Sequence, residues 1–235
     1  MRRYLLLVAF ALPCAAFAKD IQINPGATQN DFHFVSQDAV ATIEYKALAP
    51  AEASGITGFE LAAVGSWVPV HHKDNWKNLT GLDVSNLGLV GVRAIKGLPF
   101  NIDVGAFYST VPGYNVSIYG GEVKYAILPG SVVLPAVALR ASYNGTHRLD
   151  DFKLRATTVD ASVSKGFAFI TPYLGAGYVW GVASPDTATG LKRENINKSK
   201  VFAGARISLG LLHVTPEIEA IGSNVSYNLD FGIHW

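Results

Sequence analysis

Apolar and polar residues alternate along most of this chain, in segments of about ten residues, which is the length and period typical of strands that cross a membrane. Residues 225–235 show the pattern most clearly, because every second position is apolar and the positions between are small or polar. The apolar set is Val225, Tyr227, Leu229, Phe231, Ile233 and Trp235. A strand with this pattern has one apolar face and one polar face.

The same alternation predicts further strands, separated by turn residues, and helical periodicity is not sustained in our reading. Eleven segments result: residues 39–48, 56–70, 84–96, 100–111, 115–128, 132–143, 152–165, 168–183, 199–209, 212–221 and 225–235. Short connections alternate with longer polar ones such as 70–83, 144–151 and 184–198. The fold class is therefore all-β, a transmembrane antiparallel up-and-down β-barrel.

The strand number has two solutions, because eleven is odd and single-chain bacterial barrels have even numbers. A further strand hidden in 19–38 or 70–83 gives twelve, which is our prediction. Alternatively, residues 32–48 lie in the lumen as a plug, which gives ten. The chain then divides into residues 1–18, a leader; 19–38, a periplasmic or lumenal segment; and 39–235, the barrel.

Nearly all charged residues in the middle of the predicted strands fall on the face opposite the apolar one. Lipid exposure of Arg or Lys near mid-depth costs about 2–4 kcal/mol, so this parity predicts that they point into the lumen. Mixed acids and bases can form an ion-pair network that fills the lumen, or a charged ring that lines a narrow water path. The set is Glu44, Lys46, Glu60, Arg93, Asp103, Glu122, Lys124, Arg140, Asp160, Arg206, Glu217, Glu219 and Asp230.

Aromatic residues near the strand ends are typical of the interfacial girdles of membrane barrels. Alternating glycines at 175, 177 and 181 precede no helix, so they favour strand bends or lumen space over a nucleotide site. The girdle set is Tyr45, Trp67, Tyr108, Tyr143, Tyr178, Trp180 and Trp235.

The beginning of the chain predicts a secretory signal peptide. Arg2 and Arg3 precede an apolar stretch, and Ala16-Phe17-Ala18 provides a small-residue cleavage site. The apolar stretch is about half the ~20 residues that a membrane-spanning helix needs. We therefore expect cleavage near Ala18, which removes Cys14, the one cysteine of the chain, and leaves no disulfide.

Composition and motifs exclude several classes of function. The formal net charge is +1 and no basic cluster is present, which argues against nucleic acid as a partner. Hydrophobic residues make up 49% and charged residues 16%, yet no apolar run could span as a helix. The adjacent His71 and His72, and His147 near Asp150 and Asp151, form no metal or nucleophile motif. We expect no cofactor, no bound metal and no enzymatic activity.

The apolar C-terminal strand that ends on an aromatic resembles the assembly signal of Gram-negative outer-membrane barrels. Tyr227, Leu229, Phe231, Ile233 and Trp235 would form that signal. The stretches 96–109, 111–113, 120–128 and 165–169, with 47–52 and 55–59, also resemble an uncharacterised family of proteobacterial outer-membrane proteins. That resemblance implies a barrel in the outer membrane, with membrane lipid and the barrel assembly machinery as partners, and no catalytic residues.

Two functions remain open. One is a structural or surface-interaction barrel whose narrow lumen is filled with charge. The other is a small channel for small solutes, since charged rings select the ions or solutes that a pore passes. An outer-membrane enzyme is the third and least supported possibility.

Overall fold

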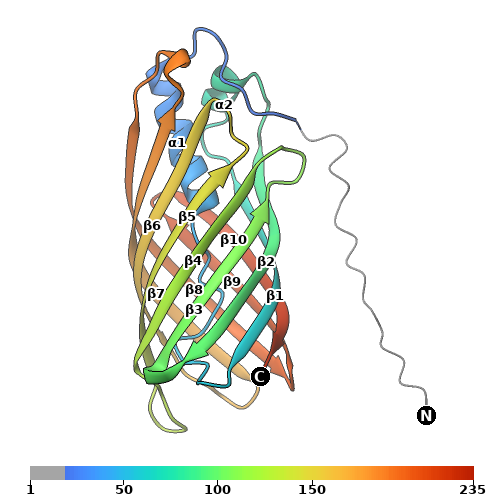
Figure 1. Ribbon diagram of the computed structural model, residues 1–235, viewed down its shortest axis with the longest axis vertical. Coiled ribbons are helices and arrows are strands. Elements are labelled where there is room, and N and C mark those ends of the chain that lie inside the picture. Colours follow the sequence, from blue (N-terminus) through green and yellow to red (C-terminus); the bar gives the residue numbers. More distant parts are fainter. Residues whose placement is uncertain (1–18) are drawn as a thin grey trace, which may run out of the picture.

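The computed structural model describes residues 19–235, and the expected leader at residues 1–18 lies outside them. Ten antiparallel strands pair in sequence order and close into a barrel, with β1 beside β10 (Figure 1). The strands are β1 (Phe59–Pro69), β2 (Asn86–Leu98), β3 (Ile102–Thr110), β4 (Ser117–Leu128), β5 (Ala136–His147), β6 (Phe152–Ser164), β7 (Ile170–Pro185), β8 (Glu194–Leu209), β9 (Leu212–Ile221) and β10 (Asn224–His234).

The pairing of β10 with β1 closes the barrel. Register runs from Glu60 opposite His234 to Trp67 opposite Tyr227. Beyond the last pair, the backbones of Phe59 and Trp235 exchange two hydrogen bonds of 2.9 and 3.1 Å. Closure satisfies the backbone groups that a sheet edge would otherwise expose.

The two ends of the barrel differ in the lengths of the connections between strands. One end carries the short turns, including 210–211 between β8 and β9, the single-turn helix η1 (Pro99–Asn101) and the C-terminus. The other end carries α2 (Lys73–Thr80) between β1 and β2, and η2 (Thr187–Thr189) between β7 and β8. We call them the short-turn end and the long-loop end; in Figure 1 they lie at the bottom and the top.

The first helix, α1 (Gln29–Ile43), lies within the long-loop half of the barrel (Figure 1). Thr28 caps it in a capping box with Asp31, which satisfies backbone donors of the first turn. The hydrogen bond from Thr28, joined by those from Asn75 and Asn78, holds the pKa of the Asp31 carboxyl below its usual value. The long-loop end is thereby tied to the start of the helix.

Our prediction of a strand at 39–48 and of twelve strands is wrong; ten, the alternative count, is confirmed. The wall begins at Phe59 rather than at residue 39. Phe32, Val35, Ala39 and Ile43 are buried on one helical face, at the i, i+3, i+4 spacing that α1 requires. The apparent alternation over residues 39–48 combines the end of this helix with an extended tail.

Interior space explains why a ten-stranded wall accommodates this helix. Eight strands leave a lumen that side chains alone can fill, and each added strand widens it. Gly181 on β7 provides further room, because a Cβ there would overlap the side chain of Val40 on α1. Within residues 19–235, no helix is long and apolar enough to cross a membrane.

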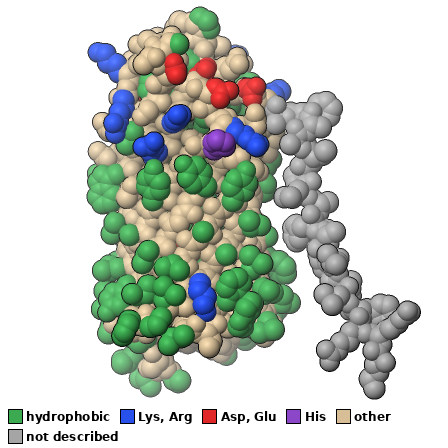
Figure 2. Space-filling view, viewed as in Figure 1, with side chains coloured by type: hydrophobic (Ala, Val, Ile, Leu, Met, Phe, Trp, Pro, Cys, Tyr) green, Lys and Arg blue, Asp and Glu red, His purple; other side chains and the backbone are tan. Residues whose placement is uncertain are grey.

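The outer surface carries the apolar face of every strand. Tyr227, Leu229, Phe231, Ile233 and Trp235 all point outward, with Trp235 58% exposed. Figure 2 shows hydrophobic side chains in two bands around the visible face, whereas charged side chains gather near the long-loop end. Tyr45 departs from the predicted girdle: it is buried in the lumen with its ring centroid 5.0 Å from that of Phe107.

Candidate functional site

The candidate site is the barrel lumen, which the N-terminal part of the chain fills. Beyond α1, residues 44–53 continue through the interior, and the exposed residues 54–57 lead to the start of β1; the whole segment has no regular structure apart from turns and bends. Every residue from 38 to 51 is buried. We call residues 29–58 the plug.

Asp38 fixes the plug to the long-loop end. Its carboxylate accepts hydrogen bonds from the backbone of His72 at 3.1 Å, the indole of Trp76 at 3.2 Å and the amide of Asn224 at 2.7 Å. His72 Nδ1 lies 3.0 Å from the same carboxylate. One buried acid therefore joins α1, α2 and β10. His72 pairs with this acid rather than with the adjacent His71.

Replacing Asp38 with alanine is expected to loosen this junction, because it leaves the buried Trp76 and Asn224 donors without an acceptor. Each such loss costs about 1–3 kcal/mol. Hydrogen exchange should accelerate in α1 and α2 and stay slow in β5–β7. Asp74→Ala removes an exposed acid on α2 and is the matched control; equal acceleration in both variants would contradict the assigned role of Asp38.

Below this junction, two lysines and two glutamates form a buried cluster. Lys46 Nζ lies 2.6 Å from Glu219, while Lys200 Nζ lies 2.8 Å from Glu44 and 3.0 Å from Glu219. All four side chains are at most 4% exposed. Each charge thus meets an opposite charge across the boundary between plug and wall, the condition under which buried ions are tolerated.

Arg140 organises the next cluster. Its guanidinium lies 3.1 Å from Asp160 and 3.4 Å from Glu122, and it donates at 3.0 Å to the carbonyl of Ala47 in the plug. It also lies 5.5 Å from the ring centroid of Phe202, a cation–π distance. Planar guanidinium geometry suits this simultaneous pairing better than an ammonium would.

Arg93 organises a third cluster, nearer the short-turn end. Its guanidinium bridges Glu60 at 2.5 Å and Asp230 at 2.8 Å. Arg206 pairs with the other oxygen of Glu60 at 2.8 Å, and His213 Nε2 lies 2.6 Å from Asp230. Glu60, His213 and Asp230 bring three potential metal-ligand atoms within 4.8 Å of one another, but two guanidiniums already neutralise these carboxylates.

Lys124 and Asp103 complete the network close to the short-turn end. Their charged atoms lie 3.0 Å apart, and Asp103 also accepts from the backbone of Ser54 at 3.1 Å. Lys124 donates in turn to the carbonyls of Pro50 at 3.1 Å and Glu52 at 2.8 Å. Both ends of this ion pair therefore hold the plug.

Cations of the wall donate to five carbonyls of the plug's irregular tail, which no helix or sheet pairs. A buried irregular segment needs such partners, because unpaired backbone groups away from water are costly. Glu217 supplies the complementary acceptor for the backbone N–H of Leu48, at 2.8 Å. The cationic donors are Lys200 to Tyr45, Arg93 to Ala47 and Leu48, Arg140 to Ala47, Arg206 to Leu48, and Lys124 to Pro50 and Glu52.

The structure brings the thirteen charges singled out in the sequence into the interior. Twelve are buried and Arg206 is partly exposed. Glu44 and Lys46 lie on the plug rather than on a strand. Sequence reasoning missed Lys200, although this residue lies within the predicted segment 199–209 and shares the inward parity of Arg206. The predicted start put Lys200 at the edge of the strand, whereas β8 begins at Glu194. Sequence reasoning also missed Asp38, because only the helix α1 brings its carboxylate to α2 and β10.

No protein-family model and no curated protein matches the chain, so the family resemblance stays a prediction. Solved structures that are similar include the N-terminal β-barrel domain of Pseudomonas aeruginosa OprF, with 14% identity, 77% of this chain and 99% of that chain covered, and a TM-score of 0.40. Neisserial surface protein A has 12% identity, with 76% of this chain and 96% of that chain covered, and a TM-score of 0.32. The transport unit of the autotransporter AIDA-I from Escherichia coli has 9% identity, with 90% of this chain and 99% of that chain covered, and a TM-score of 0.38. The closed pairing of ten strands in this chain, rather than these similarities, defines its fold.

Proposed function

We propose that the chain is an integral outer-membrane β-barrel protein with a closed lumen, and that it serves a structural or surface-interaction role. The observation that carries the proposal is the plug: residues 38–51 are buried inside the barrel and held there by wall charges. A lumen occupied in this way offers no open water path. Recognition then belongs to the outer surface and the long-loop end.

The outer face supports placement in a membrane. Large apolar side chains exposed on every strand are uncommon on soluble monomers, which rarely expose apolar patches beyond a few hundred Å². The strands have 9 to 16 residues, enough for the 9–11 that a tilted membrane strand needs. The exposed apolar side chains include Leu61, Val92, Val123, Leu139, Val159, Leu174, Val201, Ile218 and Leu229.

Orientation follows from the outer-membrane pattern of short periplasmic turns and longer external loops. The short-turn end, with the C-terminus, then faces the periplasm. The long-loop end, with α2, η2 and the start of the plug, faces outward. Its polar loops are the surface available to a partner.

A channel for small solutes is the second candidate, and the buried charges are what favours it. Release of the plug would uncover cations and carboxylates around the wall, as a selectivity ring requires. In the closed arrangement those groups bind plug carbonyls and each other. We therefore favour the closed barrel as the resting state.

Membrane integration is expected to give heat-modifiable gel mobility, because a closed barrel resists unfolding in detergent at room temperature. The unboiled protein should migrate differently from the boiled one, and the chain should float with lipid vesicles in a density gradient. Phe100→Asp, at a turn outside the strands, is a control expected to retain both properties. A compact monomer that stays soluble in detergent-free buffer would contradict the proposal.

A further inference from the structure

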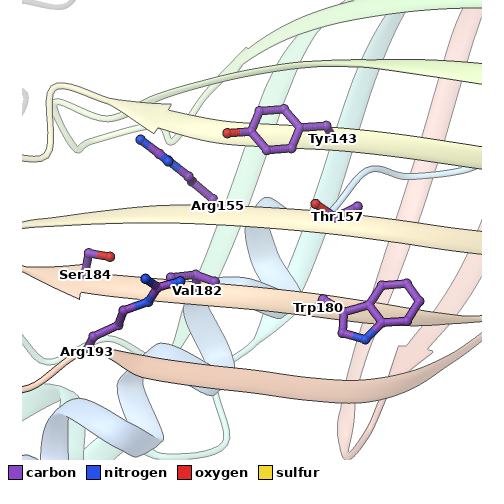
Figure 3. Close-up of a pocket in the computed structure, with 7 residues that line it drawn as sticks. All are labelled: Tyr143, Arg155, Thr157, Trp180, Val182, Ser184 and Arg193. Atoms are coloured by element: carbon purple, nitrogen blue, oxygen red, sulfur yellow. The ribbon is translucent and has the colours of Figure 1, made fainter.

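Near the long-loop end, the outer face of the wall carries a recess of about 220 Å³ between β5, β6, β7 and the start of β8 (Figure 3). Its lining combines two arginines, two aromatics and two hydroxyl-bearing side chains. These are Arg155, Arg193, Tyr143, Trp180, Thr157 and Ser184. In Figure 3 the arginines lie toward one end of the recess, and the indole of Trp180 lies toward the other.

Strand register fixes this division. Thr157 is paired with Tyr143 on one side and Trp180 on the other, so the aromatics form one row across the outer face. Arg155 lies two residues closer to the long-loop end, opposite Val182. The neighbouring residues of β6 point into the lumen and are buried, so these side chains point away from it.

The arginines have no carboxylate partner. Within residues 19–235, neither Arg155 nor Arg193 forms a salt bridge, in contrast to the paired arginines of the lumen. Lys153 projects from the same face of β6, opposite Ser184, and is also exposed and unpaired within the described chain. Three cations thus lie on the long-loop side of the aromatic row, and none forms a salt bridge within residues 19–235.

Aromatic rings of this kind lie at the level of lipid headgroups, and arginine binds phosphate oxygens bidentately. We propose that the recess binds the headgroup of a phosphate-bearing lipid, with the phosphate on Arg155 and Arg193 and the acyl chains along Trp180. The hydroxyls of Thr157 and Ser184 can donate to the same headgroup. This inference rests on the proposed membrane placement.

Native mass spectrometry of the detergent-solubilised, folded protein tests the assignment, with diphosphoryl lipid A as the probe. We expect retention of one lipid molecule, with affinity about tenfold or more above that of lipid A lacking both phosphates. The double variant Arg155→Gln/Arg193→Gln should lose this preference. Lys73→Gln/Lys77→Gln removes the same charge from exposed positions of α2 and should retain it.

Three outcomes would overturn the inference. These are equal lipid retention by the arginine variant, equal loss in the lysine control, and full displacement by millimolar inorganic phosphate, which would identify a site for free anions. Heat-modifiable mobility is measured on each sample. A protein that forms no such barrel fails the proposed function, whereas a folded barrel with no phosphate preference fails this inference alone.

Discussion

Replacing Arg140 with alanine is expected to lower the free energy of unfolding by about 3–5 kcal/mol, the usual cost of leaving buried charges without their partner. The substitution leaves the buried carboxylates of Asp160 and Glu122 without this guanidinium, and it removes a hydrogen-bond donor from the carbonyl of Ala47. Urea titration of the folded barrel in detergent, followed by tryptophan fluorescence, measures the change.

Lys153→Ala is the control, because this lysine is exposed on the outer side of β6 and forms no ion pair within residues 19–235. Its effect should stay within about 0.5 kcal/mol, as for most surface substitutions. If Arg140→Ala unfolds at the same urea concentration as the unmutated protein, solvent screens the lumen charges and the packed network described above is wrong.

The double variant Phe231→Asp/Trp235→Asp should abolish most assembly into the membrane. Both side chains point outward on β10, next to the closing seam with β1. Asp at these positions puts charge on the apolar face and removes the terminal aromatic, which packs against Phe59 in a tilted arrangement at 4.8 Å between centroids. We expect the heat-modifiable fraction in outer-membrane preparations to fall by roughly tenfold or more, which corresponds to a loss of about 1.4 kcal/mol or more.

Phe100→Asp provides the same chemical change in the exposed turn of η1, where Phe100 adopts a positive φ that Asp tolerates. Its assembly should be near normal. Normal membrane levels of the β10 variant would show that this strand is not an assembly signal.

Sequence reasoning located the strands of the wall well, because the alternation of apolar and polar residues recurs in every strand. β9 was expected at 212–221 and is found there, and the other strands of the wall begin or end within a few residues of their predicted bounds, apart from the start of β8. Several outward apolar residues have a buried charged neighbour, as Val92 has Arg93 and Val159 has Asp160, so an error of one position would turn these charges outward. Local alternation alone is therefore enough to place charges such as Asp103 and Asp230 inside.

The plug was harder to predict, because its structure depends on contacts that are remote in sequence. Its helix was hidden by residues 39–48, which alternate by chance, although the cap at Thr28 and the spacing of Phe32, Val35 and Ala39 were available signals. The tail from Glu44 has no regular secondary structure, and cations from β2, β4, β5 and β8 bind its carbonyls. Only the closed barrel brings these residues together.

The central claim is that the plug closes the lumen, and conductance of the unmutated protein in planar lipid bilayers tests it most directly. Insertion is first verified by heat-modifiable mobility of the reconstituted protein. Asp38→Ala/Lys46→Ala, which removes two attachments of the plug, serves as the variant expected to conduct. We expect no steady current from the unmutated barrel and openings from the variant; a steady, open current from the unmutated protein, with the same amplitude in the variant, would contradict the closed lumen.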